Sequence, residues 1–140
     1  MEHPHAELSR NVRRVHEAIA SADLDVMREL FASDVVWHVG GHGPLAADFK
    51  GVKAVLGLFG RIYDMADGTL AYDVHDVLAD DEHAVVLLTV RATMAGRDIE
   101  DQAVHVCHLR DGLISEVWAF QWAQDVVDDA MTEVIARAGR

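Results

Sequence analysis

Cysteine is almost absent from this 140-residue chain, in which Cys107 stands alone. A single cysteine excludes an intrachain disulfide and any zinc site built on several thiolates. Basic residues are also few, since 12 lysines and arginines stand against 24 aspartates and glutamates, for a net charge of −12. Nucleic acids and anionic membranes both bind through basic surfaces. Neither is therefore expected as a partner.

Targeting and cofactor signals are missing as well. Residues 1–10 show neither the basic start nor the apolar stretch of a signal peptide. No apolar run approaches the ~20 residues that span a membrane. We therefore expect a cytoplasmic protein without a membrane contact. The scattered histidines do not form a ligand pattern, so neither a metal nor another cofactor is expected.

What is present fits one globular domain over residues 1–140, with 51% apolar residues and enough length to build a core. Apolar residues recur at helical spacing in four segments, 5–20, 24–31, 52–66 and 124–138. β-rich or alternating patterns predict strands at 35–39, 69–79, 83–95, 98–110 and 113–122.

The connections between these segments indicate the topology. Asp111-Gly112 between two apolar runs is a strong hairpin signal, and residues 40–51 read as a glycine-rich loop. Helices followed by a meander of strands favour an α+β fold. We predict a cone-shaped, curved antiparallel sheet with three N-terminal helices on its concave face and an extra C-terminal helix. The mouth of such a cone can hold an apolar pocket.

Several motifs resemble known sequences. Residues 22–25 and 30–34, the run from Trp37-His38 to Lys50-Gly51, and residues 110–118 resemble nuclear transport factor 2-like domains. More closely, the chain resembles the SnoaL-like proteins related to ketosteroid isomerases and polyketide cyclases. The resemblance covers residues ~8–122 and implies the same cone fold.

The resemblance also implies which chemistry this chain lacks. In ketosteroid isomerases a carboxylate base works with an oxyanion-binding tyrosine and a protonated acid. Aligned on the motifs, the tyrosine falls on Val15, the base on Val39 or, with a slip of one residue, His38, and the acid on His105. Steroid isomerisation by that mechanism is therefore disfavoured. The Asp–Arg–Asp set of limonene epoxide hydrolases is absent from the strands too.

His105 is the remaining candidate for chemistry. Alternation puts Ala103, His105, Cys107 and Leu109 on one strand face, which the resemblance makes the inner face. His105 either exchanges a proton with a ligand or sits in the core, bonded to a backbone carbonyl or to Gln121. Gln121 either orients His105 or donates to a ligand oxyanion.

We accordingly predict His105 and Gln121 as catalytic residues in an apolar pocket for a hydrophobic small molecule. The expected ligand-binding residues are Val15, Ile19, Trp37, His38, Val39, His42, Phe59, Tyr63, Leu88, Val90, Cys107, Val117 and Ala119. The sequence does not decide whether Asp48, Asp73 or Asp76 reaches the cavity mouth.

Three functions stay open: an acid–base isomerase or cyclase acting on a hydrophobic carbonyl compound, a non-catalytic ligand-binding module, and a dimeric protein-interaction domain. Trp118, Phe120 and Trp122 lie opposite the inward face of the last strand. Exposed aromatic side chains mark an interface, so we expect a homodimer through this face. The alternative is that the C-terminal helix covers it.

Overall fold

The computed structural model describes residues 5–139, which form four helices and six strands. The helices are α1 (Ala6–Ser21), α2 (Leu24–Leu30), α3 (Val52–Ala66) and α4 (Gln124–Ala138). The strands are β1 (Phe31–Val39), β2 (Ala47–Lys50), β3 (Ala71–Ala79), β4 (His83–Met94), β5 (Arg97–Arg110) and β6 (Leu113–Gln121). Residues 1–4 and 140 of the predicted domain lie outside the described residues. No helix of residues 5–139 is long and apolar enough to cross a membrane.

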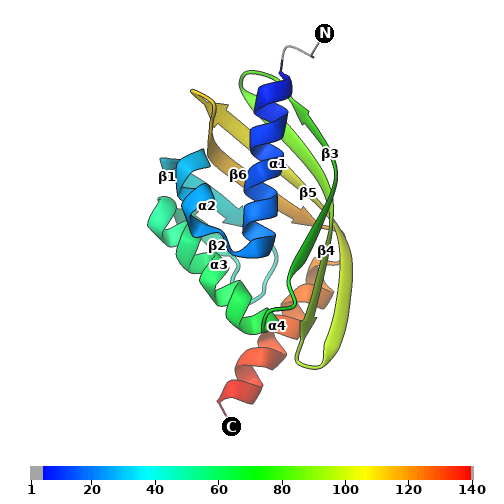
Figure 1. Cartoon of the computed structure of the whole chain (residues 1–140). Helices are drawn as coiled ribbons and strands as arrows, with labels where there is room; N and C mark the ends of the chain where they lie inside the picture. Colours follow the sequence, from blue (N-terminus) through cyan, green and yellow to red (C-terminus); the bar gives the residue numbers. More distant parts are fainter. Residues whose placement is uncertain (1–4, 140) are drawn as a thin grey trace.

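The six strands form one curved sheet in the order β2-β1-β6-β5-β4-β3 (Figure 1). Neighbours pair antiparallel, except that β1 runs parallel to β6. The parallel pair arises because the chain leaves the sheet after β2, crosses through α3, and returns as the β3–β6 meander whose last strand meets β1. This crossover joins the helical half of the chain to the meander.

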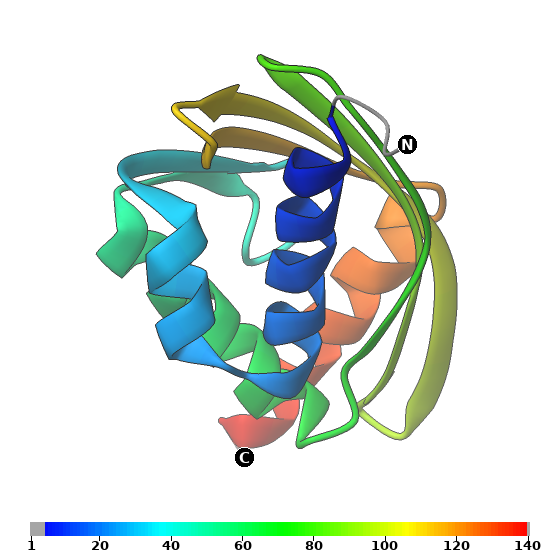
Figure 2. The ribbon, with the colours of Figure 1, turned by 45° about the horizontal axis from the view of Figure 1, so that its top comes forward.

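The helices occupy the hollow of the sheet, which confirms the predicted α+β cone (Figure 2). α1, α2 and α3 lie across its concave side, while α4 lies at the end where the β4–β5 hairpin turns (Figure 1). The buried residues of α4 are Val127, Ala130 and Met131. They face inward, so α4 does not cover the outer aromatic residues, and the alternative that it does is wrong.

The hairpin signal of the sequence has a clear backbone basis. Asp111 and Gly112 both adopt left-handed conformations, with φ of 54° and 78°. Two successive residues with positive φ match the twist of antiparallel strands, and Asp-Gly accommodates them at low cost. Asp23 likewise caps α2, since its carboxylate accepts the Val26 N–H at 3.3 Å.

Two parts of the chain differ most from the sequence prediction. Phe31 was expected at the end of the second helix and the first strand at residues 35–39, but the helix ends at Leu30 and β1 runs from Phe31 to Val39. Residues 40–51 were expected as a loop, but Ala47–Lys50 form the short edge strand β2. β2 has no buried residue, so it carries no apolar alternation that would reveal a strand.

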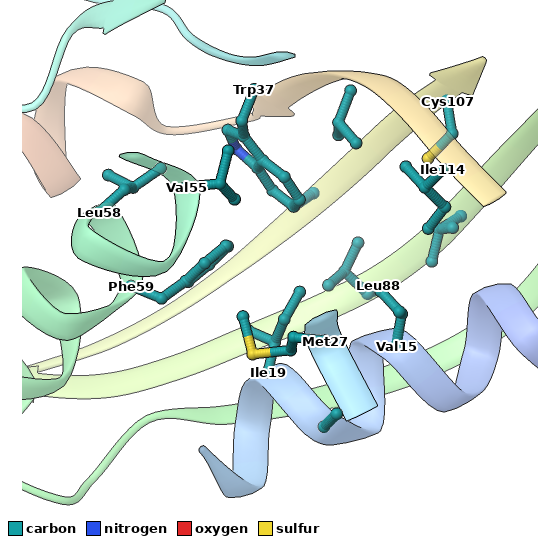
Figure 3. Close-up of a cluster of buried hydrophobic side chains, with 14 of the residues drawn as sticks. Val15, Ile19, Met27, Trp37, Val55, Leu58, Phe59, Leu88, Cys107 and Ile114 are labelled. Atoms are coloured by element: carbon teal, nitrogen blue, oxygen red, sulfur yellow. The ribbon is translucent and has the colours of Figure 1, made fainter. Parts of the chain in front are cut away.

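The core fills the narrow part of the cone. Figure 3 shows Val15 and Ile19 of α1 with Met27 of α2 on one side and Trp37 of β1 with Phe59 of α3 on another. All five side chains are buried. Beyond this packing, two cavities lie toward α4, at that end of the cone.

Candidate active site at the mouth of the cone

Two small cavities lie between the sheet, α3 and α4. The first has a volume of about 60 Å³ and the second about 50 Å³. Each has room for a few water molecules, whereas drug-sized ligands need ~300 Å³ or more. The cavities share a wall, formed by Ile62, Tyr72, Gln121, Val127 and Met131.

A pair of buried histidines borders the first cavity. His105 of β5, only 3% exposed, lines this cavity, and its Nδ1 lies 2.8 Å from Nε2 of His16 on α1. His16 is fully buried, and its Nδ1 lies 2.8 Å from the carbonyl oxygen of Val12. Among residues 5–139, no hydrogen bond involves Nε2 of His105. The partner of His105 is thus neither a backbone carbonyl nor Gln121.

Burial controls the charge of this pair. Desolvation lowers the pKa of His16 to about 4, although the bond to Val12 opposes it. Desolvation, followed by the charge of His16, holds the pKa of His105 well below its ordinary value. Both imidazoles are therefore neutral at pH 7, and a neutral imidazole keeps one lone pair for accepting a proton.

Aromatic rings hold His105 in place. Trp37 meets the imidazole edge-on, with ring centroids 5.1 Å apart, and Tyr72 does so at 6.1 Å. Tyr72 lines both cavities, and burial raises the pKa of its hydroxyl. Within the described residues no hydrogen bond engages this hydroxyl, so a proton donor near His105 is available to a ligand.

α4 closes the mouth through two aspartates. Asp128 lines the first cavity and accepts hydrogen bonds from the His42 backbone N–H at 3.0 Å and from Gln124 Nε2 at 2.9 Å. Asp101, a buried residue of β5, lines the second cavity and accepts the backbone N–H of Ala123. Both carboxylates therefore fix α4 against the rest of the cone.

The family model for the SnoaL-like domain matches residues 12–117, about three quarters of the chain. The chain belongs to this family. Its curated relatives include the uncharacterized protein Rv0034 of Mycobacterium tuberculosis, which is 32% identical over 123 residues, 87% of this chain and 90% of the relative. An uncharacterized protein of Mycobacterium bovis, Mb0035, matches equally well.

Solved structures share the SnoaL-like fold. Bal32a, from a soil-derived mobile gene cassette, has a TM-score of 0.85 at 25% identity, covering 89% of this chain and 96% of its own. A protein designated a SnoaL-like polyketide cyclase, from Jannaschia sp. CCS1, has a TM-score of 0.76 at 16% identity, covering 94% of this chain and 96% of its own. At 16% identity the second likeness concerns the fold alone.

This SnoaL-like protein brings only part of the predicted residue set to the cavities. Trp37, Val39, Phe59, His105, Ala119 and Gln121 line the first cavity, while Val90 and Gln121 line the second. Five predicted residues belong to the packed core and line neither cavity: Val15, Ile19, Leu88, Cys107 and Val117. They point inward as expected, but their neighbours fill the space around them.

The other predicted residues do not line the cavities. The Tyr63 hydroxyl donates to the Ile19 carbonyl at 2.6 Å, so it is not aimed at a ligand. His42 contributes its backbone N–H to Asp128 and lines neither cavity. Asp48, Asp73 and Asp76 are also absent from both linings.

His38 lies on the outer face of the sheet. Its Nδ1 contacts Asp48 and its Nε2 contacts Glu116, both at 2.6 Å, and its ring stacks on Trp118. Partial burial lowers the pKa of His38, but the two carboxylate hydrogen bonds and charges outweigh burial, and the net shift is upward. His38 thus supports strand pairing rather than the cavity.

The residues at the cavities or beside them that the sequence did not predict include His16, Tyr72, Asp101 and Asp128. A sequence signal existed for the first three of these. His16 follows Val12 by four residues in the buried stripe of α1. Asp101 shares the inward face of β5 with His105, and Tyr72 lies at an alternate position of β3. Asp128 had no signal, because its role depends on where α4 docks.

Proposed function

We propose that this SnoaL-like protein is an acid–base catalyst, an isomerase or cyclase, that acts on a hydrophobic carbonyl compound. The observation that carries the proposal is that a neutral His105 lines an apolar cavity and that its Nε2 has no hydrogen-bond partner in residues 5–139. A ring nitrogen that borders a cavity and has no protein partner in residues 5–139 is suited to take a proton from a ligand. Several solved relatives of the fold carry the polyketide cyclase designation, which fits this class.

The reaction follows from the cavity chemistry. His105 Nε2 removes a proton from the carbon next to a carbonyl, and the electron pair moves onto the carbonyl oxygen. The Tyr72 hydroxyl or the Gln121 amide stabilises the resulting oxyanion by a hydrogen bond. The imidazolium then returns its proton, either to another carbon or, after a new carbon–carbon bond forms, to the oxygen of the second carbonyl.

Ligand size requires some movement. Cavities of about 60 and 50 Å³ cannot hold a ring system as they stand. Met131 belongs to the shared wall, and an unbranched thioether side chain adapts easily to a new shape. We expect the two cavities to merge when Met131 and its neighbours on α4 shift.

One experiment tests the catalytic proposal. 2-Tetralone, a flat apolar ketone, is incubated with the protein in D₂O, and mass spectrometry follows the exchange of its α-hydrogens. We expect His105→Ala to lower the protein-dependent rate by about 100-fold or more. Val86→Ala is the control, because Val86 is buried and pairs with His105 across β4 and β5. It removes side-chain volume beside His105 but keeps the imidazole. Equal rates for wild type and His105→Ala would refute the catalytic proposal.

A second candidate, a non-catalytic ligand-binding module, is favoured by two observations. The low pKa of His105 makes its imidazole a weak base, and no carboxylate of residues 5–139 is hydrogen-bonded to it. A thermal shift by 2-tetralone without any exchange would favour this module, because a ligand bound only by the folded state raises the melting temperature.

For the outer face we propose a second copy of this chain as the partner. Phe120 and Trp122 are 56% and 89% exposed on the side of β6 opposite the cavity, next to the His38–Glu116 pair. A face that carries both histidines and carboxylates is complementary to itself under a two-fold axis. Sedimentation of the wild type and of Trp122→Ser at equal concentration tests this, with dimers expected only for the wild type. Monomers in both would exclude the dimer.

A further inference from the structure

We propose that His16 is a positioning residue that fixes His105 in the tautomer with its proton on Nδ1 and its lone pair on Nε2. This deepens the proposed function and rests on it for the catalytic consequence, but the tautomer itself can be measured without any substrate. These two residues lie 89 positions apart, and no sequence pattern connects them.

The Val12 carbonyl fixes the tautomer of His16. His16 Nδ1 lies 2.8 Å from the Val12 carbonyl oxygen, and a carbonyl oxygen can only accept. Nδ1 of His16 must therefore carry a proton. Because burial makes His16 neutral at pH 7, its Nε2 carries none and acts as an acceptor.

His16 in turn fixes the tautomer of His105. Nδ1 of His105 lies 2.8 Å from the accepting Nε2 of His16, so Nδ1 of His105 must donate. A neutral imidazole has one ring proton, which leaves Nε2 of His105 bare. The Val12 carbonyl thus determines the tautomer of His16 and, through it, that of His105. Two residues of α1 therefore determine which ring nitrogen of His105 is basic.

The opposite tautomer of His105, with its proton on Nε2, is energetically unfavourable. If the proton of His105 sat on Nε2, two bare nitrogens would face each other at 2.8 Å in a buried site. Both lone pairs would be desolvated without a donor, which is unfavourable. Within residues 5–139, His16 is the hydrogen-bond partner that holds the proton on Nδ1 of His105. Without His16 we expect the proton to move to Nε2, so that the ring presents an N–H to the cavity instead of a lone pair.

Nitrogen-15 NMR of the imidazole rings tests the tautomer directly, since protonated and bare ring nitrogens have well-separated shifts. The His105 signals are assigned by their loss in His105→Gln. We expect a protonated Nδ1 and a bare Nε2 in the wild type at pH 7. A bare Nδ1 in the wild type overturns the proposal, whatever the activity.

The variant His16→Leu tests the dependence on His16. We expect the proton of His105 to move to Nε2 and the exchange of 2-tetralone to slow by 10-fold or more. Val15→Ala is the matched control: it removes buried volume from the same helix, but Val15 lines neither cavity and takes no part in the Val12–His16–His105 hydrogen bonds. It should lower the melting temperature while leaving tautomer and rate as in the wild type. An unchanged tautomer in His16→Leu overturns the proposal.

A rescue variant covers the case in which His16→Leu does not fold. The amide of His16→Gln reaches about as far as Nε2 of histidine and offers an oxygen acceptor, so we expect it to retain the Nδ1–H tautomer and most of the rate. Loss of that tautomer in His16→Gln counts against the proposal. If the tautomers behave as expected but His105→Ala still exchanges 2-tetralone at the wild-type rate, only the proposed function fails.

Discussion

Asp101 on β5 accepts the backbone N–H of Ala123 with both carboxylate oxygens, at 3.2 and 3.1 Å, directly before α4 begins. The same carboxylate accepts the Gln102 N–H at 3.0 Å. A negative charge at this position also interacts favourably with the N-terminal end of a helix dipole. The helix α4, which closes the mouth of the cavities, is thus attached to β5, the strand that carries His105.

Asp101→Ala should loosen α4. Removing hydrogen bonds to a buried charged acceptor costs about 1.5–3 kcal/mol of the free energy of unfolding. Hydrogen exchange of the α4 amides should speed up more than that of the sheet. Asp129→Ala, an exposed substitution on α4, is the control and should change little. Equal protection of α4 in wild type and Asp101→Ala would contradict this attachment.

The glycine-rich loop contacts α4 too closely for a side chain. A Cβ at Gly43 would lie 2.5 Å from Asp128 Oδ1 and 2.9 Å from its Cβ, whereas a Cβ at Gly40 would meet nothing within 4 Å. We expect Gly43→Ala to lower the free energy of unfolding by about 1–3 kcal/mol and Gly40→Ala by less than about 0.5 kcal/mol. Urea unfolding measures both, and similar losses for the two variants would argue against close packing of loop and helix.

His38 should make stability depend on pH. Its pKa is raised in the folded protein from an ordinary 6.5, so protonation favours the native state. The advantage of the wild type over His38→Ala is then full below pH 6.5 and declines as the pH rises through the native pKa. Urea unfolding at several pH values checks this. His42→Ala, which keeps the backbone N–H bound to Asp128, should show a much weaker trend.

Met131 should control the space available to a ligand. Met131→Ala removes part of the wall between the two cavities and is expected to cost about 2–5 kcal/mol of stability. In return, 2-tetralone should raise the melting temperature of this variant more than that of the wild type. Val134→Ala lies on the same helix outside both linings and serves as the control. A smaller ligand shift in Met131→Ala than in the wild type would exclude the merging of the cavities.

Much of the fold could be predicted because it depends on local patterns. Period-2 alternation located β3 to β6 within two residues, and Asp111-Gly112 marked the last hairpin. β2 was missed, since an edge strand with no buried residue has no apolar pattern. Phe31 was misplaced because a buried aromatic side chain suits either the end of a helix or the start of a strand.

For the candidate site, the sequence by itself determined which residues of one strand share a face. Alternation along β5 groups His105 with Ala103, Cys107 and Leu109, and it places Asp101 on the same side. This grouping needs no tertiary information, because successive side chains of a strand point to opposite faces. The family resemblance identified that face as the inner one.

Only the tertiary structure decided what those residues meet. His16 and His105 are brought together by the docking of α1 on the sheet, and Asp128 reaches the cavity because α4 closes the mouth. Such contacts join positions far apart in the chain, and their geometry depends on how whole elements pack. The grouping of residues on one face is a local property of a strand, whereas a hydrogen-bond partner, a tautomer and an empty volume are properties of the assembled core.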